Sequence, residues 1–138
     1  MPVQQTRSVL TSADLDAILH AAREEATRNG WLVTIAVVDE GGHPLALQRL
    51  DGAAPVTAYI AGEKARTAAL ARRESKGYED SINGGRTALV TVGVLNGMLE
   101  GGVPILIGGH CIGAVGVSGV KPDQDAQVAR AGIAAVAG

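Results

Sequence analysis

The sequence has very few aromatic residues, with no Phe, one Trp and two Tyr among its 138 residues. Proteins that bind single strands of nucleic acid stack bases on aromatic rings, and every nucleic-acid surface needs a concentration of positive charge. The 12 Lys and Arg residues are balanced by 14 Asp and Glu and are largely scattered along the chain. The sequence therefore predicts no nucleic-acid partner.

Cysteine is almost absent as well, because Cys111 is the single one in the chain. One thiol forms neither an internal disulfide nor a multi-thiolate metal site, and a lone Cys is most often a small core residue. The three histidines, His20, His43 and His110, show no metal-binding spacing such as HExxH or HxH. We therefore expect no bound metal ion and a reducing compartment.

No long hydrophobic run is present, since the longest covers eight residues, 31–38, and includes Thr34. Crossing a bilayer takes roughly 20 apolar residues. The first residues, MPVQQTRSVLTSAD, contain no apolar core and no small-residue cleavage site of a secretory signal. The expectation is a cytoplasmic protein with no membrane partner.

The overall composition, with 46% hydrophobic and 19% charged residues, is typical of a globular protein. The length predicts one domain that covers residues 1–138. Its 19 glycines have no collagen period and indicate tight turns and close backbone packing. Helical periodicity, period-two runs and turn residues then predict the order of elements. The prediction is a helix at 11–30, strands at 31–38 and 45–50, a helix at 56–73, a loop with at most one helical turn at 74–87, a short strand at 88–95, a hairpin of 104–107 with 110–117, and a helix from Pro122.

This order predicts an α+β fold in which helices cover an antiparallel sheet. The first helix has clear ends, because Thr11 and Asp14 have capping-box spacing and Asn29-Gly30 is a stop signal. His20 falls on its polar face, where we expect a solvated pair with Asp16.

Lys64 is the most informative polar residue of the second helix, because it lies within a face of small side chains. A lysine there either extends along its own stem to solvent or is buried against a carboxylate. We predict the second arrangement, with Asp39, Asp51 or Asp125 as the partner, since a buried unpaired ammonium costs several kcal/mol. The other members of the face are Ile60, Ala61, Ala65, Ala68 and Ala71.

Several polar residues fall at strand ends and on inward helix faces, where they form either a small ligand pocket with ionic contacts or a structural network. Periodicity does not choose between the two. The set comprises Asp39, His43, Arg49, Asp51, Lys64, Ser118 and Asp125.

Six short runs occur together and in order over residues 9–138, and as a set they resemble the GlcG/HbpS family, which includes the C-terminal domain of PduO-type cobalamin adenosyltransferases. The runs are VVDEGGH from Val37, QRLDGA from Gln48, AGEKARTA from Ala61, GGVPI from Gly101, IGAVGVSG from Ile112 and DxxVAxAGI from Asp125.

The resemblance implies a profilin-like fold with a five-stranded antiparallel sheet, assembled into dimers and often octamers. It also implies an oligomeric small-molecule-binding protein, with haem or another tetrapyrrole as the first ligand to consider. His43, His110 and Met98 are then candidate axial ligands. Lys64, Arg49, Asp51, Ser118 and Asp125 all fall on motifs of the family.

A different class of function is also consistent with the sequence: a cofactor-free enzyme acting on a small carboxylate or an aromatic breakdown product. Arg49 or Arg66 would bind the substrate carboxylate, and Lys64 would be the catalytic acid, base or amine nucleophile of a tautomerase, hydratase or hydrolase. A third alternative is a purely structural subunit with no ligand.

Overall fold

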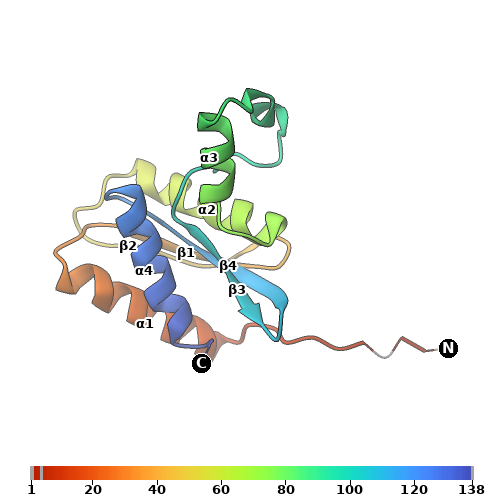
Figure 1. The fold of residues 1–138 in the computed structure, drawn as a ribbon. Coiled ribbons are helices and arrows are strands. Elements are labelled where there is room, and N and C mark those ends of the chain that lie inside the picture. Colours follow the sequence, from red (N-terminus) through yellow and green to blue (C-terminus); the bar gives the residue numbers. More distant parts are fainter. Residues whose placement is uncertain (1, 4, 138) are drawn as a thin grey trace.

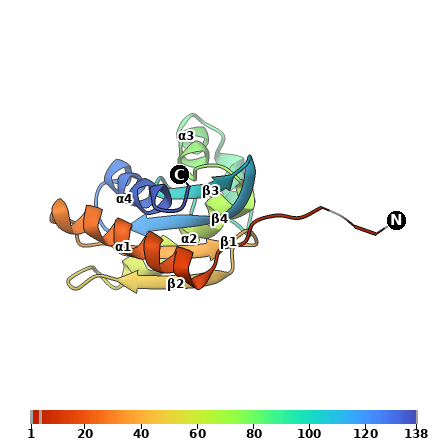
Figure 2. The same cartoon turned by 90° about the horizontal axis from the view of Figure 1, so that it is seen from below.

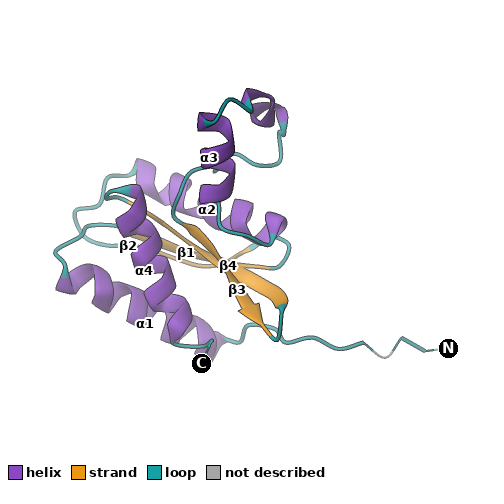
Figure 3. Cartoon of the chain, in the orientation of Figure 1, coloured by secondary structure: helices purple, strands orange, loops and turns teal. Residues whose placement is uncertain are grey.

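The computed structural model describes residues 2, 3 and 5–137, and its central element is an antiparallel sheet (Figure 1, Figure 3). Four strands form the sheet in the order β2-β1-β4-β3. The strands are β1 (Thr34–Asp39), β2 (Pro44–Arg49), β3 (Gly102–Ile107) and β4 (His110–Ser118).

Helices cover both faces of this sheet, as the two perpendicular views show (Figure 1, Figure 2). The helices α1 (Ser12–Arg28) and α4 (Pro122–Ala134) pack side by side on one face, and α2 (Val56–Ala71) covers the other. The short helix α3 (Lys76–Asn83) and the 3-10 turn η1 (Thr87–Thr91) form an arm that projects from the body. Among the described residues, no helix combines the length and apolar character needed to cross a bilayer.

The two faces of the sheet use different side chains, because successive residues of a strand point to opposite sides. Ile35 and Val37 of β1 join the core under α1 and α4, whereas Ala36 and Val38 join a second core under α2. Branched side chains dominate the first core, and alanines dominate the second. The many small residues of the sequence therefore belong mainly to the α2 side.

Small side chains let α2 lie unusually close to the sheet. Gly116 of β4 lies so near α2 that a Cβ atom built on it would be 2.1 Å from the Ala61 carbonyl oxygen and 2.5 Å from the Ala65 nitrogen. Atoms cannot approach to such distances, so glycine is required at this position.

Local signals in the sequence predicted several boundaries correctly. Thr11 caps α1 in a complete capping box with Asp14, and Gly30 follows the helix with φ +71°. The hairpin of β3 and β4 turns through Gly108 and Gly109, both with positive φ, which is the type I′ arrangement.

Three predictions about the middle of the chain and the sheet are wrong. Residues 74–87 contain the full helix α3, stabilised by an ion pair between Lys76 and Asp80 and by Arg73 stacked on Tyr78 at 4.0 Å. Residues 88–95 form no strand, because η1 occupies their start and the segment lies on the arm, away from any sheet edge. The described sheet therefore has four strands instead of five.

Candidate functional site

Lys64 is buried, as predicted, and its partner is Asp125. The residue is 4% exposed, and its Nζ atom donates hydrogen bonds of 3.0 Å to Asp125 Oδ2 and to the Val117 carbonyl oxygen. The other carboxylate oxygen of Asp125 accepts the Val120 N–H at 3.1 Å. The pair therefore joins α2 on one face of the sheet to the first turn of α4 on the other.

A glycine directly before β3 makes room for this crossing. A Cβ atom on Gly101 would lie 2.8 Å from Lys64 Nζ and 2.9 Å from its Cδ, and Gly101 has a φ of +133°.

Burial raises the pKa of Asp125, and the Lys64 ammonium counteracts this only in part. The ammonium would have to leave Asp125 before it could act on a substrate.

Asp39 and His43 lie at the opposite end of β1 from this ion pair. Asp39 Oδ1 accepts the backbone N–H groups of Gly41 at 2.9 Å and His43 at 3.0 Å, and it lies 3.0 Å from His43 Nδ1. Burial opposes ionisation of this carboxyl, but the two backbone donors and the imidazole outweigh it and lower the pKa of Asp39.

The remaining predicted residues do not converge on one pocket. Ser118 is buried at the end of β4, next to Thr34 in the sheet, whereas Arg49 and Asp51 are exposed near the end of β2. Arg66 donates from Nη1 to the Val94 carbonyl oxygen at 2.8 Å and so connects α2 to the segment that follows η1. The predicted set is thus divided between two ends of the sheet.

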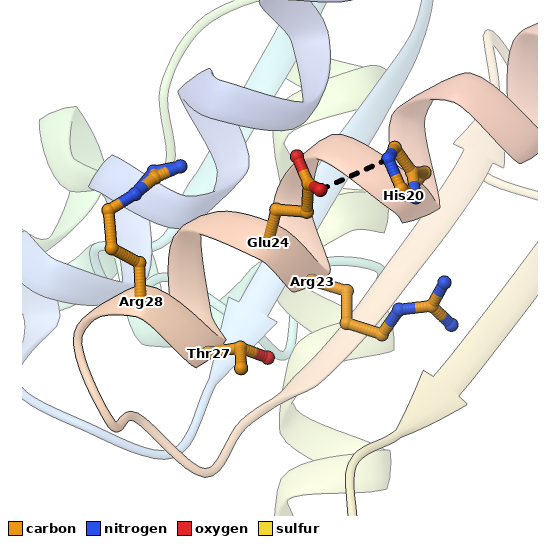
Figure 4. A pocket seen from close by; sticks show the side chains of 5 residues that line it. All are labelled: His20, Arg23, Glu24, Thr27 and Arg28. Carbon is orange, nitrogen blue, oxygen red and sulfur yellow. Dashed lines mark ion pairs between the residues drawn. The ribbon is translucent and has the colours of Figure 1, made fainter.

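A shallow, open groove lies elsewhere, on the solvent side of α1, and has a volume of about 510 Å³. All the residues that line it come from this one helix (Figure 4). His20 pairs through Nε2 with Glu24 Oε1 at 3.3 Å, and both side chains are more than half exposed, at 63% and 61%. The groove is lined by His20, Arg23, Glu24, Thr27 and Arg28.

A mainly apolar cavity of about 340 Å³ shares Arg23 and Thr27 with this groove and continues it to Trp31, Leu32 and the predicted site residue Asp51. The two together bring an imidazole, two guanidinium groups, the carboxylates of Glu24 and Asp51, and an apolar surface into one region. This combination is able to bind a flat apolar ligand that carries carboxylates.

The sequence analysis placed His20 on the correct face of the helix but predicted the wrong partner. The prediction was Asp16, and the structure shows Glu24. Both acids are four residues away, and the longer Glu side chain makes the contact. The overlooked signal was the recurrence of His20, Arg23, Thr27 and Arg28 at intervals of three, four and one on a single helix face.

His110 and Cys111 line a further cavity at the hairpin, of about 220 Å³, together with Arg7 and Arg72. Cys111 is half-buried there, so the prediction of a core cysteine is wrong. The hairpin register shifts between Ile105 and Leu106, and Cys111 lies beside that irregularity, near the end of the sheet. Met98 is half-buried in the segment before β3.

Comparison with known proteins identifies the group to which this fold belongs. The family model described as "Haem degrading protein HbpS-like" matches residues 10–134. The chain belongs to the HbpS-like family. Protein GlcG of Escherichia coli is 57% identical to this HbpS-like chain over 114 residues, which cover 83% of this chain and 84% of GlcG.

Two solved structures share the fold over almost their whole length. A double mutant of HbpS from Streptomyces reticuli has a TM-score of 0.87 and 30% identity and covers 99% of this chain and 97% of its own. The PduOC–heme complex has a TM-score of 0.83 and 28% identity and covers 94% and 96%. The predicted family and the predicted α+β fold are therefore confirmed.

Proposed function

We propose that this HbpS-like chain binds haem, with His20 as the axial ligand and the groove on α1 as the site. The observation that carries the proposal is the cluster of His20, Arg23 and Arg28 around one groove, next to the apolar surface of Trp31 and Leu32. The relation to a protein solved as a heme complex supports the choice of ligand.

Each part of the groove matches a part of the haem group. Histidine is a common ligand of haem iron, and the imidazole of His20 is accessible. Arg28 Nη1 pairs with Glu25 Oε1 at 3.1 Å, and Arg23 Nη1 contacts Gln48 Oε1 at 3.4 Å. Each guanidinium keeps further N–H groups that are able to contact a propionate. Trp31, Leu32 and Leu50 provide an apolar surface for the edge of the ring. Glu24 is 61% exposed, so it can leave Nε2 of His20 without becoming buried.

The same groove supports an oligomeric form of the protein. It is shallow and open, so one chain leaves much of a bound planar ligand exposed to water. Small-molecule sites normally bury most of the surface of their ligand. A second copy of the chain over the groove would supply the missing cover, and we therefore propose a homo-oligomer as the binding form.

A titration with hemin tests the proposal through the Soret absorption band. We expect the band to shift on binding to the wild-type protein, and His20→Ala to weaken binding by about tenfold or more, which corresponds to about 1.4 kcal/mol. Arg23→Gln should weaken binding less, because it removes one propionate contact and leaves the axial ligand.

His43→Ala is the matched control, since His43 is also exposed but lies at the β1–β2 turn, where Asp39 binds it. It should bind hemin like the wild type. An unshifted Soret band in the wild type would contradict haem binding altogether. A band lost with His43→Ala or His110→Ala but kept with His20→Ala would contradict the choice of site.

A further inference from the structure

We infer a second binding site, for the oxyanion group of a small carboxylate or phosphate compound, formed by Arg7, Arg72 and His110 at the β3–β4 hairpin. This site goes beyond the proposed haem function and shares no lining residue with the groove at His20. Its three residues come from the N-terminal segment, the end of α2 and the start of β4.

Two adjoining cavities carry the inference. One, of about 470 Å³, and the other, of about 220 Å³, both have Arg7, Arg72 and His110 among their lining residues. Neither cavity is lined by an Asp or Glu residue. In a chain with a net charge of −2, two guanidinium groups face one concave surface, and Glu40 offsets the charge of Arg7 in part.

Arg7 is held in position by Glu40, whose Oε1 atom it contacts at 2.9 Å through Nη2. That bond uses one of the five N–H donors of the guanidinium and leaves others for a ligand. Among the described residues, no acidic side chain pairs with Arg72. A ligand oxyanion would therefore contact the guanidinium of Arg7, which Glu40 also binds, and the guanidinium of Arg72, which has no acidic partner among the described residues.

The backbone of Arg72 has an unusual conformation. It ends α2 in the left-handed conformation, with φ 57° and ψ 34°, and it is the only described non-glycine residue with positive φ. Helices that end in this way usually have Gly at this position, because the conformation disfavours residues with a Cβ atom. The side chain of Arg72 can therefore be removed by Arg72→Gly without strain in the backbone.

The other lining residues narrow the class of ligand. Leu106 is 50% exposed beside the smaller cavity, so an apolar part of a ligand has a surface to contact. The two cavities together have room for a small organic molecule that carries one anionic group. A small organic carboxylate or a phosphate ester has this chemistry.

The single thiol of Cys111 reports on the site, because it lines the smaller cavity and is half-buried. Iodoacetate carries a negative charge and iodoacetamide does not, so the ratio of their alkylation rates measures the local field. We expect Arg72→Gln to lower this ratio about threefold to tenfold. Phosphate or acetate should slow alkylation of the wild type more than chloride does at the same ionic strength.

Arg86→Gln is the matched control, since Arg86 is an exposed arginine on the projecting arm. It should keep both the wild-type ratio and the protection by anions. Arg72→Gly removes the side chain but suits the left-handed backbone, so it should lose the protection while the protein remains folded. Protection by phosphate alone would identify a phosphoryl group, and protection by acetate alone a carboxylate.

Two results would overturn the inference. One is equal protection of Cys111 from alkylation by chloride, phosphate and acetate, which would show that the anions act only by screening charge and not by binding at a site. The other is anion protection that persists in both Arg72 variants. Hemin binding is measured separately, so failure of either site leaves the other testable.

Discussion

At the scale of single residues, Asp39 shows how a turn can stabilise a charge. Its carboxylate accepts two backbone N–H groups and contacts the imidazole of His43. Because these contacts favour the ionised form, the pKa of Asp39 is lower in the folded protein than its usual 3.8. An acid whose pKa is lower in the folded protein than in the unfolded chain stabilises the fold at pH values above its unfolded pKa. This contribution is lost as the pH falls through the folded pKa.

We therefore expect Asp39→Asn to lower the free energy of unfolding at pH 6, on the order of 1 kcal/mol. The difference from the wild type should shrink as the pH falls below about 4, where the unfolded carboxyl begins to take up its proton. Urea unfolding across this range measures it. Asp51→Asn, at an exposed position, should change stability by less than about 0.5 kcal/mol. A difference between Asp39→Asn and wild type that stays constant down to pH 2 would contradict the argument.

At the scale of elements, the packing of α2 on the sheet depends on Gly116, which has no side-chain atoms to separate the helix from β4. Gly116 lies against the backbone of α2, which cannot withdraw without loosening its other contacts in the alanine core. Gly62 lies on the same helix, and a Cβ atom there would meet nothing within 4 Å. The two glycines therefore have opposite physical roles.

Gly116→Ala should lower the free energy of unfolding by about 2 kcal/mol or more, because the added methyl group pushes α2 away from β4. Gly62→Ala should raise it by about 0.5–1 kcal/mol, since alanine favours the helix. Thermal and urea unfolding of both variants decide the matter. An unchanged or raised stability of Gly116→Ala would contradict the close approach of α2 to β4.

At the scale of the whole molecule, the ion pair of Lys64 and Asp125 links the two helical layers across the sheet. Both groups are almost completely buried, at 4% and 2% exposure. Removing one partner would leave the other buried without its counter-charge, which is the expensive outcome for such pairs. Replacing both with apolar residues avoids that penalty.

Lys64→Ala should lower the free energy of unfolding by about 3 kcal/mol. The double substitution Lys64→Met with Asp125→Leu should recover much of the loss. The exposed pair of Lys76 and Asp80 provides the control, because Lys76→Ala should cost no more than about 0.5 kcal/mol. A loss within 0.5 kcal/mol for Lys64→Ala, measured by urea unfolding, would show that the pair contributes little.

Much of this protein was predictable from sequence because the relevant physics is local. The capping box of Thr11, the two-glycine hairpin turn and the small-residue face that buries Lys64 all depend on residues within a few positions of one another. The inward position of Asp125 follows from helical periodicity in the same way. These features needed no knowledge of how the elements are arranged.

The tertiary structure alone decided which distant residues meet. Periodicity shows that a side chain points inward, but the order of strands and the crossing of helices determine what it touches, so Asp125 could not be distinguished from Asp39 or Asp51. The helix α3 was missed because it is only eight residues long and its polar residues and Gly77 are also typical of a loop. The cluster of Arg7, Arg72 and His110 forms only because the hairpin brings three distant segments together.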